Sequence, residues 1–443
     1  MRHLPIGTIA QILGLSCESQ AFVEGYQLDS RLVEAGTLFF ALSGQKTDGH
    51  AYLAEASARG AVGAVVLQGY RGPDFGLVLL FVPDVVAALQ TLARVLMADC
   101  KARLVGITGS LGKTTTKEFV STLLAGKYRV GKTLGNYNTK LTYPITLLNR
   151  TGDEEVLVAE MGMSEPQEMR RLIEIAAPNV AVLTQVARVH IAHFPGGLAE
   201  IAREKAVIFS HPKTKVSIFF HGLHEFADAI CMLSGERISF SLEDRAADYF
   251  LSNEYFIDER GVRSYRFDPP YKQPHILHNF LAAVSVARAM KMQWDEIQAQ
   301  VPHLQLPKMR FERFERKGVT FVNDAYNANP DSMRAALSSL PEPKEGGKRI
   351  AVLGMMVDMG DESEMIHCDV GRFAQKCVDY LLVFGKGAEP IYEGFKEVKK
   401  PAEHYFDFPS LATRLERILI PGDVVLIKAS RKVGMEQLLH WMS

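Results

Sequence analysis

Residues 106–116 read GITGSLGKTTT, and this stretch decides the fold that the rest of the chain must support. It ends the apolar run LVGIT (104–108) and leads into a helical pattern, KEFVSTLLAG (117–126). Glycines at 106, 109 and 112 let backbone N–H groups turn inward around a phosphate, and the next helix adds its positive N-terminal end. Lys113 would then contact the β- and γ-phosphates, and the Thr114 hydroxyl would ligate Mg²⁺.

The pattern is the shorter GxxGK[ST], because Ile107 occupies the first glycine position of the strict GxxxxGK[ST] form. A glycine-rich turn that serves only the fold is the alternative. The order glycine, lysine, threonine between a strand and a helix favours a nucleoside triphosphate site. No NKxD guanine-reading segment is present in the sequence, so we expect ATP rather than GTP.

Short apolar runs alternate with helical patterns on both sides of this loop, which is typical of parallel sheets with crossover helices. At about 150 residues per domain, 443 residues allow roughly three domains. We expect an α/β fold with a smaller N-terminal α/β domain (1–99), a central domain (100–309) and a Rossmann-like C-terminal domain (310–443). The central domain should hold a P-loop-type, mostly parallel sheet with helices on both faces. Expected strands are 36–41, 63–67, 104–108, 156–159, 180–184, 319–322, 350–353, 380–384 and 424–427.

Composition excludes several classes of protein. Lys plus Arg is 50 and Asp plus Glu is 51, so the net charge of −1 argues against binding nucleic acid through bulk charge. No run reaches 18 apolar residues and no secretory signal opens the chain, so we expect no membrane insertion. Five cysteines without CxxC spacing fit a reducing compartment, and we expect a cytoplasmic protein.

Polar or small residues follow the expected strands, and ligands of open α/β sheets collect at the carboxyl ends of strands. These residues are Gly109, Glu160, Gln185, Asp324, Gly354, Gly385 and Lys428. Strands also end in polar turns where nothing binds, so the positions gain meaning only beside other motifs.

Glu160, His190 and Lys205 form a candidate metal site downstream of the phosphate loop. A carboxylate and an imidazole near a triphosphate could hold Mg²⁺, since hard cations prefer oxygen ligands. Lysine joins such a site only if CO₂ converts its amine to a carbamate. Taken alone, Lys205 reads as a solvated helix lysine and His190 as a structural histidine. A zinc site is disfavoured because no HExxH and no cysteine partner is present.

Several segments together resemble the Mur ligase family, the ATP-dependent amide-forming enzymes of peptidoglycan assembly. They are LDSRLVEAGTLFFALSGQKTDGHAYLAEASARGA (28–61), TGSLGKTTTKEF (108–119), EMG (160–162), VARVHIAHF (186–194), EIAREKAVIF (200–209), NDAYNANPDSMRAAL (323–337), VLGMMVDMGDESEMIH (352–367) and IKASRKVGMEQLL (427–439). The resemblance covers about residues 28 to 440, and YNANP is its most specific part.

The resemblance implies an activity: D-alanyl-D-alanine joined to UDP-N-acetylmuramoyl-tripeptide through an acyl phosphate, with ATP giving ADP and phosphate. It implies two Mg²⁺ ions and a CO₂-derived carbamate on Lys205, with Thr114, Glu160, His190 and Lys205 as metal ligands. It also favours a monomer, and it assigns the first domain to the UDP-linked precursor.

The same resemblance implies roles for single residues. Catalysis falls to Lys113, Asn138, Glu160, His190 and Lys205. The nucleotide is assigned to Gly109, Ser110, Gly112, Lys113, Thr114, Thr115, Asn279, Arg310, Asp324, Tyr326 and Asn327. The two other substrates are assigned to Ser30, Arg31, Asp48, Asn136, Asn329, Ser430 and Arg431. Without the resemblance, Asn279 would be interpreted as a helix cap and Tyr326 as a core aromatic.

The chain departs from the family pattern at Thr139, Thr142, Asn323 and Val207, and the change at 207 weakens the metal assignment. Two alternatives therefore stay open. One is another amide ligase of the family, either the tripeptide-forming enzyme or a folylpolyglutamate synthase. The other is a catalytically degenerate, nucleotide-binding regulatory module.

Overall fold

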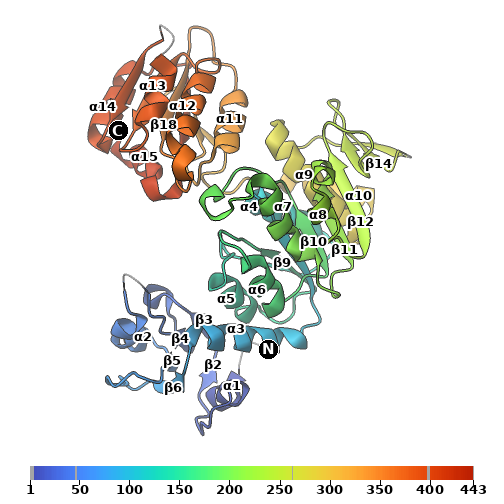
Figure 1. Ribbon diagram of the computed structural model, residues 1–443, viewed down its shortest axis with the longest axis vertical. Helices are drawn as coiled ribbons and strands as arrows, with labels where there is room; N and C mark the ends of the chain where they lie inside the picture. The colour runs from blue at the N-terminus through green and yellow to red at the C-terminus, as the bar shows by residue number, and fades with distance from the viewer. Residues whose placement is uncertain (1–3, 45–46, 262, 397–399, 443) are drawn as a thin grey trace.

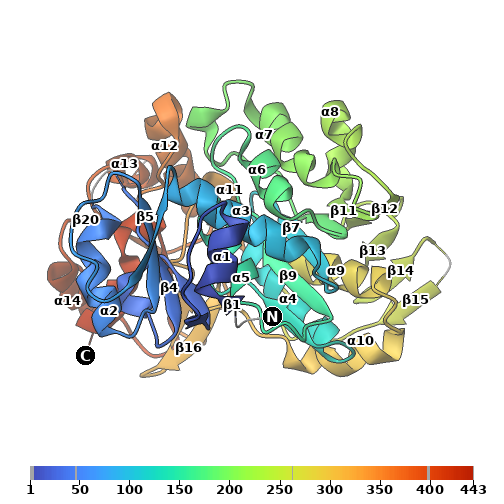
Figure 2. The ribbon, with the colours of Figure 1, turned by 90° about the horizontal axis from the view of Figure 1, so that it is seen from below.

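The computed structural model describes residues 4–44, 47–261, 263–396 and 400–442. The chain has the expected α/β class, with three lobes that each carry their own sheet (Figure 1). The N-terminal lobe, in blue, lies at one end of the central lobe and the C-terminal lobe, in orange and red, at the other. Figure 2 shows the N-terminal lobe from below, with the central lobe beside it.

The N-terminal lobe is built on a parallel sheet of order β3-β4-β5-β6. Its elements are β1 (Leu4–Pro5), α1 (Ile6–Ile12), β2 (Phe22–Val23), β3 (Gly25–Gln27), β4 (Thr37–Phe40), α2 (Leu53–Ala58), β5 (Gly63–Leu67), β6 (Val78–Val82) and α3 (Val85–Ala98). β4 is buried at every position, as a continuous apolar run predicts for a parallel strand. Asp84 caps α3 by accepting from the N–H groups of Val86 and Ala87.

The central lobe carries a nine-stranded sheet of order β15-β14-β13-β12-β11-β10-β7-β9-β8. Its strands are β7 (Arg103–Thr108), β8 (Val130–Lys132), β9 (Val156–Glu160), β10 (Val180–Leu183), β11 (Val216–Phe220), β12 (Glu236–Ser241), β13 (Tyr249–Leu251), β14 (Phe256–Glu259) and β15 (Arg263–Arg266). Its helices are α4 (Lys113–Ala125), α5 (Thr142–Leu148), α6 (Glu168–Ile175), α7 (Gly197–Ala206), α8 (Ala227–Ile230), α9 (Pro274–Ala289) and α10 (Trp294–Gln300). Only the pairs β13–β14 and β14–β15 are antiparallel.

The register of the central strands positions the phosphate loop. Thr108, the last residue of β7, pairs with Leu183 of β10 on one side. On the other side, Ile107 pairs with Glu160, the last residue of β9. The loop that follows β7 therefore lies between Glu160 and the segment that follows β10, at the carboxyl edge of the sheet.

The C-terminal lobe has a six-stranded sheet of order β16-β17-β21-β18-β19-β20, parallel except for the pair β16–β17. Its elements are β16 (Glu312–Arg316), β17 (Val319–Asn323), α11 (Pro330–Ser338), β18 (Arg349–Gly354), α12 (Ser363–Ala374), β19 (Tyr380–Phe384), α13 (Glu389–Lys396), β20 (Ala402–Tyr405), α14 (Phe408–Ile418), β21 (Val424–Lys428) and α15 (Leu438–Trp441). Pairing of Asn323 with Ile427, and of Leu353 with Lys428, brings three strand ends to one edge.

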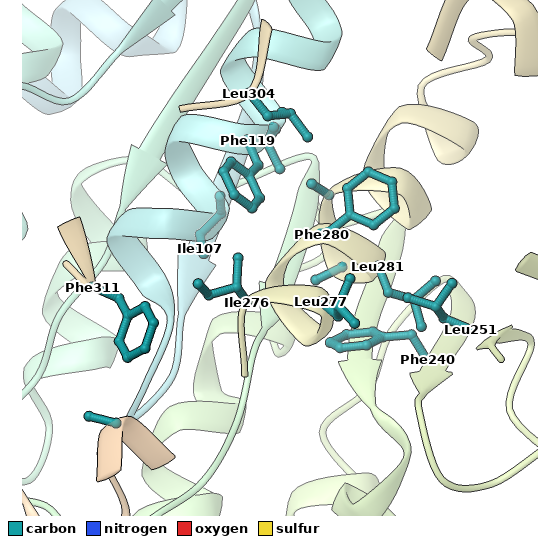
Figure 3. Close-up of a cluster of buried hydrophobic side chains, with 14 of the residues drawn as sticks. Ile107, Phe119, Phe240, Leu251, Ile276, Leu277, Phe280, Leu281, Leu304 and Phe311 are labelled. Atoms are coloured by element: carbon teal, nitrogen blue, oxygen red, sulfur yellow. The ribbon is translucent and has the colours of Figure 1, made fainter. Parts of the chain in front are cut away.

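Packing of α4 against α9 fixes the helix that begins at the phosphate loop. Figure 3 shows Phe119 of α4 and Phe280 and Leu281 of α9 within one cluster of buried side chains. Each of these side chains is almost completely removed from solvent, which stabilises the fold by about 1.5–3 kcal/mol per side chain. In the part of the chain that the structure describes, no helix is long and apolar enough to cross a bilayer.

Candidate active site

The phosphate loop has the backbone geometry that its glycines predict. Gly109 and Gly112 have φ angles of +149° and +78°. A Cβ on Gly109 would come within 2.0 Å of the Thr184 hydroxyl, and one on Gly112 within 2.0 Å of the Asn279 side-chain oxygen. Both positions therefore require glycine, for conformation and for space. Close approach of backbone to a ligand is the usual use of such positions.

The Lys113 ammonium lies inside this loop. It donates to the Gly109 carbonyl at 2.7 Å, and burial lowers its pKa. The negative charge of Glu160 opposes that shift, while the guanidinium of Arg310 adds to it. A phosphate chain seated on the loop would supply the negative charge that this group of cations lacks.

Glu160 is held by hydrogen bonds on both carboxylate oxygens. Asn138 donates to one oxygen at 2.7 Å and the Thr114 hydroxyl to the other at 2.8 Å. Its backbone N–H donates to the Thr133 hydroxyl at 3.1 Å, and the side chain is buried. The carboxylate is thus fixed beside the hydroxyl that the sequence predicts as a magnesium ligand.

His190 and Lys205 both lie within the electrostatic influence of Lys113. Lys205, on α7, is 1% exposed, and burial and then the charge of Lys113 hold its pKa well below its usual range. Across the described ranges, the Lys205 ammonium has no hydrogen-bond or salt-bridge partner. Burial, Lys205 and Lys113 together lower the pKa of His190 to about 4, so its imidazole is neutral at pH 7. Its approach of 3.6 Å to Asp358 is consequently a polar contact rather than an ion pair.

A cavity of about 390 Å³ opens between the central and C-terminal lobes. Its walls include these predicted residues: Ser110, Gly112, Lys113, Thr114, Thr115, Asn279, Arg310, Asp324, Asn327 and Asn329. Gln185 and Lys428, which were expected only as strand-end residues, also line it, and so do His275 and His278, which were not predicted. Asn279 lies within α9 and accepts from the Thr116 hydroxyl at 3.3 Å, so the interpretation as a helix cap is wrong.

Arg310 and Tyr326 form a stacked pair near this cavity. The guanidinium lies 4.1 Å from the ring centre, and Arg431 approaches the same ring at 5.8 Å. The Arg310 Nε is buried, and among the described residues it has no hydrogen-bond partner. Tyr326 is only partly buried, so the interpretation as a core aromatic is wrong. A buried guanidinium nitrogen without a partner fits an anionic ligand that would accept from it.

Lys428, expected only as one of the polar residues at strand ends, is a further functional candidate. It is 1% exposed, donates to the Asp324 carboxylate at 2.6 Å and to the Asn327 carbonyl at 2.9 Å. The second Asp324 oxygen accepts from the Phe311 N–H at 3.0 Å. The position of Lys428 directly after an apolar run was the available signal in the sequence. Its ion pair with Asp324 joins residues about a hundred positions apart, and the sequence alone does not reveal such a contact.

Two residues predicted for the dipeptide end are engaged in holding loops. Asn329 caps α11, because its side-chain oxygen accepts from the Ser332 N–H at 2.9 Å. The buried Ser430 hydroxyl accepts from the Val357 N–H at 3.0 Å and donates to the Ala328 carbonyl at 3.3 Å. Arg431 forms an ion pair with Glu436 at 2.7 Å. Their contribution to substrate binding stays a prediction.

The predicted uridine-diphosphate residues lie in the N-terminal lobe, away from the cavity of the nucleotide site. Ser30 donates to Glu55 at 2.8 Å, and Arg31 pairs with Asp29 at 2.6 Å. Asp48 accepts from the backbone N–H of His50 at 3.1 Å. Arg31 also lines a second cavity, of about 790 Å³, between the N-terminal and central lobes.

The sequence departures lie close to the site without breaking it. The hydroxyls of Thr139 and Thr142 bond each other at 3.0 Å at the start of α5, and Asn136 is exposed. Val207 begins the short helix after α7. Within the described residues, no group of three His, Cys, Asp or Glu side chains could hold a metal by itself. A hydroxyl, one carboxylate and one neutral imidazole fit Mg²⁺, and Lys205 fits only as an oxygen donor.

Three Mur ligase models match this chain: the middle domain over residues 107–287, the glutamate ligase domain over 309–431 and the family catalytic domain over 23–71. The UDP-N-acetylmuramoyl-tripeptide–D-alanyl-D-alanine ligase of Bacillus subtilis is 30% identical over 441 residues, which covers 95% of this chain and 93% of that protein.

Solved structures agree with these matches. MurF from Acinetobacter baumannii superposes with a TM-score of 0.84 at 27% identity, covering 99% of this chain and 98% of that one. MurF ligase from Thermotoga maritima in complex with ADP gives 0.80 at 30% identity, covering 94% and 96%. The chain therefore belongs to the Mur ligase family.

Proposed function

We propose that this protein is an ATP-dependent ligase that joins D-alanyl-D-alanine to UDP-N-acetylmuramoyl-tripeptide, giving the pentapeptide precursor of peptidoglycan, ADP and phosphate. One observation carries the proposal: Lys113 lies in a glycine cradle, and its charge interacts with Glu160, His190 and Lys205. The names of relatives that match along almost the whole chain specify the substrates.

The chemistry explains why cations gather at this point. A carboxylate is a poor electrophile, so its oxygen first attacks the γ-phosphorus of ATP, the bond to ADP breaks and an acyl phosphate forms. The amine of the dipeptide then attacks the acyl carbon, phosphate leaves and the amine loses a proton. Two anions must approach each other in the first step, which makes positive charge at the phosphates the main catalytic need.

Each residue of the site has a separate role in binding the nucleotide or the other substrates. Lys113 binds the β- and γ-phosphates and stabilises the charge that develops during transfer. Asn279 binds the adenine, while Arg310 and Asp324, held by Lys428, bind the ribose or the phosphates. Tyr326, Asn327 and Asn329 line the path between nucleotide and dipeptide.

The same residues suit two magnesium ions. Thr114 and Glu160 would hold one, and His190, Glu160 and a carbamylated Lys205 would hold the other. When bound, the ions neutralise charge on the phosphates and on the approaching carboxylate. Asn138 fixes the Glu160 carboxylate at 2.7 Å for this purpose. The pKa of Lys205, lowered by burial, supports the carbamate because a neutral amine reacts with CO₂.

The remaining proposals concern the whole molecule. We propose that domain boundaries lie near residues 99/100 and 309/310, between α3 and β7 and before β16. Ser30, Arg31 and Asp48 would hold the uridine diphosphate arm, with Asn136 near the reacting centre and Ser430 and Arg431 at the dipeptide end. The protein would work in the cytoplasm as a monomer.

A substrate assay separates this proposal from its rivals. Phosphate release is measured with ATP and UDP-N-acetylmuramoyl-tripeptide, in lysine and diaminopimelate forms, with and without D-alanyl-D-alanine. The proposal predicts release that depends on the dipeptide and a pentapeptide product. Phosphate release that does not depend on the dipeptide but requires a single amino acid would indicate another ligase of the family. ATP binding without turnover would indicate a degenerate regulatory module.

A further inference from the structure

The loop of residues 355–362, which follows β18 in the C-terminal lobe, meets the loop that carries His190 in the central lobe. His190 Nδ1 lies 3.6 Å from an Asp358 carboxylate oxygen. Arg188 lies 3.8 Å from Glu362, and a Cβ placed on Gly360 would lie 3.6 Å from the Cβ of Ala192. The lobes therefore touch at the candidate metal ligand itself.

The backbone on both sides of this contact is held in an unusual conformation. His190 has φ +55°, Asp358 has φ +62° and Gly360 has φ +60°. Residues other than glycine rarely adopt the left-handed region, and they stay there only where the surrounding structure holds them. Strained residues facing each other across a lobe boundary favour a functional contact over a chance one.

The position of the Asp358 carboxylate beside Nδ1 gives this contact a chemical consequence. An imidazole that ligates a metal through one ring nitrogen carries its proton on the other. The hydrogen bond made by that N–H decides which of the two nitrogens is protonated. Asp358 offers a negative acceptor beside Nδ1. The separation of 3.6 Å exceeds a hydrogen bond, but hydrogen bonds of active sites are often long without ligands and shorten in the complex.

We propose that Asp358 is a positioning residue supplied by the C-terminal lobe. Its carboxylate accepts the Nδ1–H of His190 and so leaves Nε2 unprotonated as the ligand nitrogen. The magnesium site would then be complete only when the two lobes are together. The role of Nε2 rests on the proposed function, whereas the position of the ring proton does not, because it exists without metal or substrate.

The first experiment reads the ring proton directly. Ring ¹⁵N spectra are recorded on metal-free, nucleotide-free protein, with His190 assigned by difference from H190Q. We expect the Nδ1–H form in the parent protein and a shift toward Nε2–H in D358N and D358G. Asparagine and glycine both tolerate positive φ, so these variants avoid backbone strain. Their thermal unfolding is compared with that of the parent as a check on folding.

E362Q is the matched control, because it breaks the neighbouring exposed ion pair on the same loop. We expect its ring spectrum to match the parent. Unchanged spectra in D358N and D358G would overturn the proposal, and so would an equal change in E362Q, which would indicate general docking of the lobes.

The second experiment measures the Mg²⁺ dependence of phosphate release. We expect D358N and D358G to raise the Mg²⁺ concentration for half-maximal rate by about tenfold or more, with KM for ATP nearly unchanged, because partners of metal ligands typically contribute 10–100-fold. D358E should restore part of the affinity. A changed ring spectrum with unchanged Mg²⁺ dependence would contradict the role of Asp358 at the metal. A parent protein that shows no dipeptide-dependent release would instead refute the proposed function and leave the spectra interpretable.

Discussion

Lys117 and Lys205 are both buried in the central lobe, but their ammonium groups differ in their hydrogen-bond and ion-pair partners. Lys117, on α4, is 0% exposed, donates to the carbonyls of Thr133 and Gly135 at 2.8 and 2.9 Å, and pairs with Glu118 at 3.0 Å. Lys205, on α7, is equally buried, but in the described part of the chain its ammonium has no such partner.

The difference separates a structural cation from a reactive amine. Partners of the Lys117 ammonium offset its loss of water, and through Thr133 they also support the strand end that carries Glu160. An unpartnered buried charge is costly, so burial shifts the pKa of Lys205 well below its usual range, in favour of the neutral amine. The surroundings of Lys117 are therefore complete within the fold, whereas the amine of Lys205 is left without a partner in the described residues, as the proposed carbamate requires.

We expect the largest effect when the Lys113 cation is removed. Lys113→Ala should lower dipeptide-dependent phosphate release by more than about 100-fold, because cations at the phosphates act in the transition state. Steady-state kinetics at saturating ATP would measure it. Retention of near-parental kcat would remove Lys113 from the chemistry.

The second effect concerns Lys205 alone. Lys205→Met should reduce activity by about 100-fold or more, as loss of a group acting in the transition state does, yet leave Tm unchanged or higher, since an apolar side chain suits the unpartnered site. Short carboxylates such as acetate should restore part of the activity by occupying the space of the carbamate.

Lys215→Met, on the surface, is the control and should leave both activity and Tm unchanged. Full activity of Lys205→Met without added carboxylate would rule out the second metal assignment.

The third effect is the reverse pattern at Lys117. Lys117→Met should lower the free energy of unfolding by about 2–5 kcal/mol, because it leaves two buried carbonyls without donors. Denaturant unfolding would measure it, and acetate should restore nothing. If Lys117→Met and Lys205→Met changed stability equally, the distinction between the two lysines would be wrong.

The smallest effect is a dependence of stability on pH. Burial lowers the pKa of His275 and of His278 to about 4, from an ordinary value of 6.5. The unfolded chain binds more protons between these values, so stability should fall as pH drops from about 6.5 to 4. The contribution of His278, which packs edge-on against Phe240, should vanish in His278→Phe, while the exposed His303→Gln keeps the parental slope. Thermal unfolding at stepped pH would measure both.

Most of the buried parallel strands at the sheet centres could be predicted from the sequence, because such strands are short continuous apolar runs. Residues 63–67 and 380–384 were predicted with the bounds that β5 and β19 have, and the other expected strands differ at their ends only by one or two residues. β16 (ERFER) and β20 (AEHY) were missed because charged and half-exposed strands have no such run. β11–β15 were missed as well, although β11 (VSIFF) and β13 (YFL) are largely apolar.

The residues of the candidate site also fall into two groups: those with a local sequence signal and those that depend on contacts between distant segments. Local signals predicted the phosphate loop, because glycine, lysine and threonine act within one turn of chain. Asp358, Lys428 and Lys117 depend on contacts between segments far apart, such as the 2.6 Å bond between Lys428 and Asp324. Residue types alone do not report such contacts.

The most direct test of the account is ¹³C NMR of the protein with ¹³C-bicarbonate, ADP and Mg²⁺. The account predicts a carbamate signal that is lost on acidification, absent from Lys205→Met and retained in Lys117→Met. A parent spectrum without that signal, or one that persists in Lys205→Met, would contradict it.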